Sequence, residues 1–204
     1  LVGELPRALL GRALAAIGKT RSPRALAALA AFLDRNDEVD AAALSHIARA
    51  ARWPGAGPPP ELLSRLRGML GAPQKATREQ AAVILGTLRD EHATADLLEL
   101  LLDGEEGVRT SARWALEQIS GLSYRADPRR WQEWYASELR WWQYEAPALF
   151  RALRSEDRAS KVAAAQTVAK RRLFRSDLAR ELLPLLHSPE PELATLGCKA
   201  LGSL

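Results

Sequence analysis

Residues 92–120 read HATADLLELLLDGEEGVRTSARWALEQIS, and they carry the strongest structural pattern of the chain. Leu97, Leu98 and Leu101 make the first half of this stretch apolar, and Asp103-Gly104 follows as a turn signal. The second half repeats its apolar side chains at the spacing of one helix face: Val108, Ala112, Ala115, Leu116 and Ile119. The stretch therefore predicts two helices joined by a tight turn.

The composition of the whole chain also favours helices. Its 204 residues include 37 Ala and 35 Leu but only 6 Val and 4 Ile. Ala and Leu stabilise helices, whereas β-branched side chains favour strands. With 47% hydrophobic residues, the chain can bury a continuous core. We therefore expect an all-α fold.

A small residue followed four positions later by Leu, Ile or Val recurs along the chain. The pairs are Ala13/Ile17, Ala43/Ile47, Ala81/Leu85, Ala112/Leu116, Ala164/Val168 and Gly197/Leu201. Successive pairs lie 30, 38, 31, 52 and 33 residues apart, which indicates a repeat with two longer connections. The small residue would allow close helix approach, and the larger one would fill the space beside it.

The remaining sequence shows the same two-helix pattern. Helices are expected near 2–18, 22–34, 37–51, 60–71, 75–89, 145–154, 158–171, 176–187 and 190–203. Proline stands near several of the expected helix starts, where its missing amide hydrogen is tolerated. Residues 54–60, PGAGPPP, are interpreted as a stiff spacer that accounts for the 38-residue spacing.

The best repeat carries, in this order, Leu101-Leu102-Asp103, Val108-Arg109, Ala112 and Leu116. This order resembles HEAT repeats, specifically the short bacterial, PBS-lyase-type form. The resemblance implies an alpha-solenoid, a superhelix of about five to six HEAT-like helical hairpins. It specifies an architecture rather than an activity.

The other repeats keep less of this pattern. Asp40, Lys161 and Ala194 stand where the HEAT pattern has Arg, and Thr77 stands where it has Val. The family pattern places a ladder of Asp and Arg side chains between neighbouring repeats. We therefore expect this ladder to be broken.

We expect one HEAT-like repeat domain over residues 1–204, interrupted by an aromatic insertion at 122–144. The first helix matches the second helix of a hairpin, and Leu201 and Leu204 of the last helix lack an evident cover. Terminal repeats normally carry polar outer faces. The chain is therefore expected to be a piece of a longer one, or to form an oligomer through its uncapped ends.

The insertion concentrates the tryptophans, since five of the six Trp residues lie between 114 and 142. Asp127-Pro128 predicts a helix start. One face of that helix holds Trp131, Trp134, Tyr135 and Trp142. Trp141 and Leu139 lie at the flanks of this face. Residues 119–135 are similar to an aromatic appendage that follows repeats in some bacterial HEAT proteins and to which no activity is attached.

Two interpretations of the aromatic face stay open. It can pack as a buried brace over the seam between repeats, or Trp141 or Trp142 can remain partly exposed as a contact site. Glu138 lies inside the stripe, where a charge is unexpected. A buried carboxylate needs a partner such as Arg, so we expect a structural ion pair rather than a catalytic acid.

The sequence carries no catalytic or metal-binding motif. His46, His92 and His187 lack neighbours at metal-ligand spacing, and the single Cys198 cannot form a disulfide within the chain. Neither a phosphate-cradling glycine loop nor a Gly-x-Ser-x-Gly elbow is present. We expect no enzyme activity, no cofactor and no metal.

The compartment stays open. No apolar stretch approaches the roughly 18 residues of a membrane span. The chain begins with Leu rather than Met, so we expect that an upstream segment was removed or left out. The protein is then cytoplasmic, or periplasmic or secreted if that segment was a signal peptide.

The expected function is that of a non-enzymatic scaffold. It would bind another protein through the concave face of its second helices and the adjoining aromatic insertion. The candidate contacts are Arg113, Glu117, Arg129, Arg130, Arg140, Trp141 and Trp142.

The alternative is a nucleic-acid-binding protein similar to the HEAT-like DNA glycosylases. The formal charge of +4 is too small to indicate nucleic acid by itself. Cations nevertheless gather in the last third of the chain: Arg140, Arg151, Arg154, Arg158, Lys161, Lys170, Arg171, Arg172 and Arg175. Tetrapyrrole-lyase activity, known among short HEAT-like proteins, has less support because no chromophore-handling Cys or His motif is visible.

Overall fold

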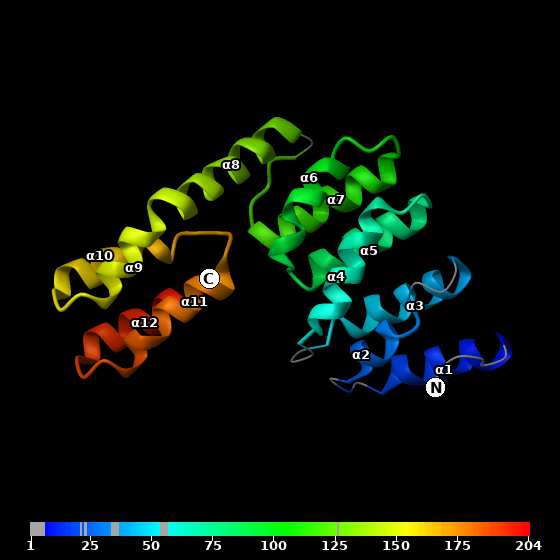
Figure 1. Ribbon diagram of the computed structural model, residues 1–204, viewed down its shortest axis with the longest axis horizontal. Coiled ribbons are helices and arrows are strands. Elements are labelled where there is room, and N and C mark those ends of the chain that lie inside the picture. The colour runs from blue at the N-terminus through cyan, green and yellow to red at the C-terminus, as the bar shows by residue number, and fades with distance from the viewer. Residues whose placement is uncertain (1–6, 21, 23, 34–36, 54–56, 126) are drawn as a thin grey trace. The chain divides into compact units, whose positions relative to one another are not determined.

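The computed structural model describes residues 7–20, 22, 24–33, 37–53, 57–125 and 127–204. Within these ranges every regular element is a helix, so the prediction of an all-α fold is confirmed (Figure 1). Contacts divide the chain into two compact units, Leu1–Pro128 and Arg129–Leu204. The boundary falls inside the expected aromatic insertion. That both units act as one domain stays a prediction.

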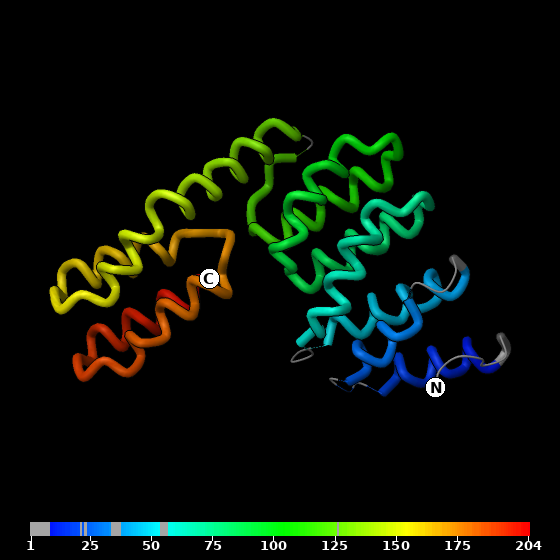
Figure 2. The backbone as a smooth tube through the Cα atoms, in the orientation of Figure 1, coloured from blue at the N-terminus to red at the C-terminus, as the bar shows by residue number. Residues whose placement is uncertain are grey.

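The first unit consists of helical hairpins that follow a leading helix. Its elements are α1 (Arg7–Lys19), α2 (Ala25–Ala30), α3 (Asp37–Ala50), α4 (Pro60–Gly68), η1 (Met69–Gly71), α5 (Lys75–Thr87), η2 (Glu91–Ala93), α6 (Thr94–Leu100) and α7 (Glu106–Ser120), where η marks a 3-10 turn. Along the unit α1, α3, α5 and α7 pack side by side, and each of the last three also packs on the helix before it (Figure 2). The leading helix α1 therefore occupies the position of a second helix, as its sequence predicts.

The second unit holds the aromatic helix and further hairpins. Its elements are α8 (Pro128–Tyr144), which starts at the unit boundary, α9 (Ala146–Arg154), α10 (Arg158–Val168), α11 (Arg175–Leu182), η3 (Leu183–His187) and α12 (Pro191–Ser203). Helix α10 packs on both α9 and α12, so second helices are neighbours here too. The repeated two-helix arrangement thus continues on both sides of the aromatic helix.

The ends of several helices differ from expectation. The helices expected over 22–34 and 60–71 end at Ala30 and Gly68. The helix expected over 158–171 ends at Val168, and the one expected over 176–187 becomes a 3-10 turn after Leu182. Pro184 explains the last of these differences, because proline lacks an amide hydrogen and its ring clashes with the preceding helical turn. Leu201 and Leu204 were expected to be uncovered, but they are half-buried and pack against the core of the second unit.

Helices α5 and α7 approach each other closely at Gly86. A Cβ atom on Gly86 would lie 2.6 Å from the Ala115 Cα atom and 2.9 Å from Cζ3 of Trp114. Contact with α7 therefore requires glycine here. The small residues of the repeat pattern act in the same sense, since Ala81 and Ala112 are completely buried.

Arg78 of α5 links its repeat to the next turn. Its Nε donates to Oδ2 of Asp103 at 2.9 Å, and its Nη2 donates to Oδ1 at 3.0 Å. Its Nη1 also donates to the carbonyl oxygens of Ala72 and Pro73. Arg109 donates instead to the carbonyl oxygen of Asp103 in its own turn. Arg78 and Asp103 thus form one intact rung of the ladder that the sequence predicts to be broken.

Replacing Gly86 by Ala should destabilise the first unit. The added methyl group would overlap the Ala115 backbone. Overpacking of this kind costs about 1–3 kcal/mol, while Ala gains up to about 1 kcal/mol over Gly in a helix. Urea unfolding followed by circular dichroism measures the net loss. Gly68→Ala is the matched control, because nothing lies within 4 Å of a Cβ there, and it should be stabilising. Equal effects of the two variants would contradict the packing argument.

Replacing Asp103 by Asn should cost about 1–3 kcal/mol at neutral pH, because Asn cannot provide the charge that pairs with Arg78. Hydrogen bonds from Arg78 hold the pKa of the Asp103 carboxyl below its ordinary value. The resulting stabilisation is complete above the unfolded-state pKa of about 3.9 and is lost as the pH falls through the lower folded-state pKa. The gap between the urea midpoints of wild type and variant should therefore shrink below about pH 4. A gap of constant size would argue against the ion pair.

Candidate functional site

The aromatic insertion forms one long helix with a buried stripe. The buried side chains of α8 are Trp131, Trp134, Glu138 and Trp141, at positions i, i+3, i+7 and i+10. The sequence predicts Trp141 at the flank of the aromatic face. In the structure the buried face of α8 includes both Glu138 and Trp141. Trp142 is half-buried and Leu139 is exposed.

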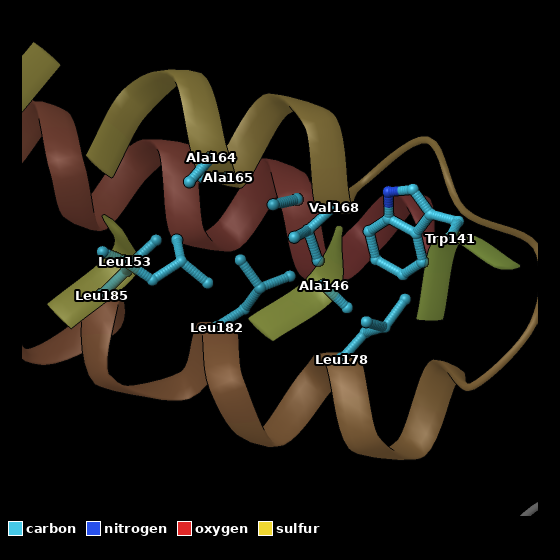
Figure 3. Packing of buried hydrophobic residues seen from close by; sticks show 10 residues of the cluster. Trp141, Ala146, Leu153, Ala164, Ala165, Val168, Leu178, Leu182 and Leu185 are labelled. Atoms are coloured by element: carbon cyan, nitrogen blue, oxygen red, sulfur yellow. The ribbon is translucent and has the colours of Figure 1, made fainter. Parts of the chain in front are cut away.

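Trp141 belongs to the core of the second unit. It is 2% exposed, and it packs with Ala146, Val168 and Leu178 (Figure 3). Its prediction as a contact residue is therefore wrong, because a core side chain presents no surface to a partner. Trp142 remains a candidate.

Glu138 has the arginine partner that its position requires. The carboxylate is 6% exposed, and its Oε1 lies 3.4 Å from Nη1 of Arg171. The Arg171 guanidinium also stacks over the Trp141 ring, with Cζ 4.2 Å from the ring centroid. An ion pair and a cation–π contact therefore fasten the α10–α11 connection to α8. The expectation of a structural ion pair at Glu138 is confirmed.

Phe174 reinforces this connection. Its ring stacks on Trp142, with centroids 4.4 Å apart and planes inclined by 27°, and Phe150 meets the same indole edge-on at 5.7 Å. Phe174 has a left-handed backbone, with φ 61°, which is unusual for a bulky residue. Stacking on Trp142 gives a physical reason for an aromatic residue at this strained position.

Ion pairs occupy part of the basic C-terminal third. Arg154 lies 2.5 Å from Glu181, and Arg158 lies 3.4 Å from Glu190. Arg171 is engaged with α8. These cations already have carboxylate partners, so the patch offers fewer phosphate contacts than its composition suggests.

The predicted contacts divide between the two units. Arg113 and Glu117 are half-buried on α7, and Arg129, Arg130 and Arg140 are exposed on α8. The hydroxyl of Ser123 donates to Glu117 Oε1 at 3.1 Å. Arg113 borders a hollow of about 300 Å³ whose other walls are Leu101, Glu106, Arg109, Thr110 and Pro128.

Trp114 of α7 was not predicted from the sequence as a contact residue. This side chain is 36% exposed although it packs over Gly86 of the preceding repeat. It stands one position before the buried Ala115, and therefore outside the apolar stripe of the helix. That position was the available signal, because a Trp outside the core stripe of a second helix lies at the surface.

A groove between α10 and α12 was likewise not predicted from the sequence. It consists of two adjoining hollows of about 460 and 400 Å³ that share Leu196 and Lys199. The first is completed by Arg158, Val162, Pro191, Glu192, Leu193 and Thr195. The second is completed by Ala165, Gln166, Ala169, Lys170, Ala200 and Ser203. We call this surface the α10–α12 groove.

Charges in the groove are distributed unevenly. At its start Arg158 is ion-paired with both Glu190 and Glu192. Lys199 in the middle and Lys170 at the far end have no ion-pair partner among the side chains that the structure describes. The middle and the far end of the groove are therefore cationic.

Neither a metal-binding cluster nor a membrane-spanning helix is found among the described residues. Their His, Cys, Asp and Glu side chains form no group of three that could hold a metal ion. Among the described helices, none combines the length and apolar character needed to cross a bilayer.

Residues 34–117 match the family model for HEAT repeats. The prediction of HEAT repeats is therefore confirmed for this segment, which runs into α7. No curated protein sequence matches the chain significantly.

Several solved structures are similar to the chain. One is the complex of CpcE and CpcF of phycocyanin lyase from Nostoc sp., at 18% identity over 100% of this chain and 91% of that chain, with a TM-score of 0.47. Another is a designed armadillo repeat protein in complex with the peptide (KR)4, at 17% identity over 97% and 92%, with a TM-score of 0.41. A further designed armadillo repeat protein aligns at 17% identity over 99% and 96%, with a TM-score of 0.45.

Replacing Trp141 by Ala should lower the free energy of unfolding by about 3–5 kcal/mol, because it leaves a cavity in the core and removes the ring beneath Arg171. Tyr144 is the control on the same helix, since it is 71% exposed, and Tyr144→Ala should change stability by no more than about 0.5 kcal/mol. Chemical unfolding followed by circular dichroism compares the two. A Trp141 variant as stable as the Tyr144 variant would show that Trp141 is not a core residue.

Proposed function

We propose that this chain is a non-enzymatic scaffold that binds another protein through the exposed face of its second helices. This is the face that the HEAT pattern predicts to be concave. Second helices pack side by side in the first unit, so they present a continuous surface built from regular elements. A preformed surface of this kind loses little conformational entropy on binding, which favours recognition.

The observation that carries this proposal is the exposure of Trp114. The ring is held against Gly86, so its orientation is restrained before any partner arrives. Restrained, partly exposed tryptophans and arginines are the side chains that most often dominate binding energy at protein interfaces. Arg113 and Glu117 flank Trp114 on α7 and add charges of both signs.

Further support comes from the residues of α8. Arg129, Arg130 and Arg140 are exposed and Trp142 is half-buried, so these four remain candidate contacts on the second unit. Trp141 is not one of these candidate contacts, because it lies in the core. The partner surface proposed for α7 does not depend on these residues.

Exchanging the charges of α7 tests the proposal. The double variant Arg113→Glu with Glu117→Arg keeps the net charge but reverses the pattern beside Trp114, so capture of the partner should fall at least about tenfold. The measurement is affinity capture from a lysate of the source organism, quantified by mass spectrometry. The matched control is Asp177→Arg with Arg180→Asp on the first helix α11, where the two side chains pair at 2.5 Å.

The outcomes separate clearly. A protein retained by wild type and by the α11 control, but lost from the α7 variant, supports the proposal. Equal capture by all three chains would overturn it. Retention that disappears on nuclease treatment would also overturn it, and would favour nucleic acid as the partner.

A further inference from the structure

We infer that the α10–α12 groove binds an acidic, partly apolar segment of another protein. This inference rests on the proposed protein-binding function and names the chemistry of one partner segment. It concerns a surface of the second unit that is separate in sequence from the α7 surface.

The dimensions of the groove suit a short segment of polypeptide. Its two hollows, of about 460 and 400 Å³, adjoin along α10, a helix of 11 residues. A helix rises about 1.5 Å per residue, so the groove extends for roughly 16 Å. That length accommodates about three turns of a bound helix, or about five residues of an extended strand.

The walls of the groove are apolar and low. Val162 and Leu196 are half-buried, so each keeps part of its aliphatic surface accessible. Ala165 and Ala169 line the α10 side of the second hollow. Because alanine projects little from a helix, a partner backbone can approach α10 closely, and an apolar side chain of the partner can lie against Leu196.

The charged side chains of the groove favour a negatively charged partner segment. Lys199 contributes to both hollows, and Lys170 closes the far end. Neither ammonium group has an ion-pair partner among the described side chains, whereas Arg158 at the near end is already paired with Glu190 and Glu192. Carboxylates of a bound segment would therefore pair with Lys199 and Lys170, and basic side chains would be repelled from the middle and far end of the groove.

A peptide fits these observations better than a nucleic acid does. Phosphate backbones bind to tracks of several accessible cations. The lining of this groove supplies only two lysines without an ion-pair partner among the described side chains, and apolar residues also line it. A sugar–phosphate chain has no apolar group to place against those residues. Alternating apolar and acidic side chains match both features.

A phage-displayed library of random 12-residue peptides provides an unbiased probe. Selection on the whole chain should enrich peptides with Leu or Phe flanked by Asp or Glu. The best peptide, labelled with fluorescein, is then titrated by fluorescence anisotropy against wild type, Lys199→Glu, Lys170→Glu and Arg151→Glu. Arg151 is exposed on the first helix α9, so its reversal changes the net charge equally and serves as the matched control.

Lys199→Glu should weaken binding at least tenfold, Lys170→Glu several-fold, and Arg151→Glu less than twofold. A labelled oligothymidylate is titrated in parallel. Enrichment of basic peptides, failure to enrich any peptide, or equal weakening by all three reversals would overturn the inference. Tighter binding of the oligothymidylate, weakened by Lys199→Glu, would overturn it in favour of a nucleic-acid surface.

The two proposals fail in distinguishable ways. If partner capture depends on Arg113 and Glu117 while no peptide depends on Lys199, the protein-binding function stands and the groove is excluded. If the selected peptide depends on Lys199 but capture ignores the α7 charges, the groove is a binding site and the α7 surface is not.

Discussion

The contact of α5 with α7 at Gly86 is the constraint on which the first unit depends. Helices can come this close only if one of them lacks a side chain at the crossing, and here the Ala115 backbone occupies the space that a Cβ atom would need. Ile84, Leu85 and Leu116 beside this crossing are completely buried. Arg78 of α5 donates to Asp103 in the next turn. The same crossing keeps Trp114 at the surface, because the position beneath its ring is already filled by helix backbone. Core packing and the candidate binding surface therefore have one origin.

The second unit satisfies a different constraint, namely the burial of a carboxylate within an aromatic stripe. Glu138 forms an ion pair with Arg171, one of the cations of the basic C-terminal third, and the Arg171 guanidinium lies over the Trp141 ring. Arg171 and Trp141 are therefore engaged in contacts within the unit and are not available as a contact surface. Phe174 accepts a left-handed backbone beside them and stacks on Trp142. Trp141 and Arg171, which stood out in the sequence, are thus structural in this unit.

The surfaces that remain for function are those the core does not use. On α7 they surround Trp114, and between α10 and α12 they form a groove with apolar walls and two lysines that have no ion-pair partner among the described side chains. At neither surface do the described His, Cys, Asp and Glu side chains form a group of three that could hold a metal ion. Rigid faces with fixed anchors suit recognition, which is why both proposals concern binding.

The sequence by itself determined the all-helical fold, the two-helix repeats and most helix positions. These follow from local propensity and from periodicity, which act within one or two turns of chain. It also predicted the arginine partner of Glu138, because a buried carboxylate must be paired. The tertiary structure alone decided that Trp141 is core, that Leu201 and Leu204 are partly buried, and that Val162, Leu196 and Lys199 meet in one groove. Each of these facts depends on which helix faces approach each other, and residues more than 30 positions apart along the chain set that geometry through packing that no local pattern encodes.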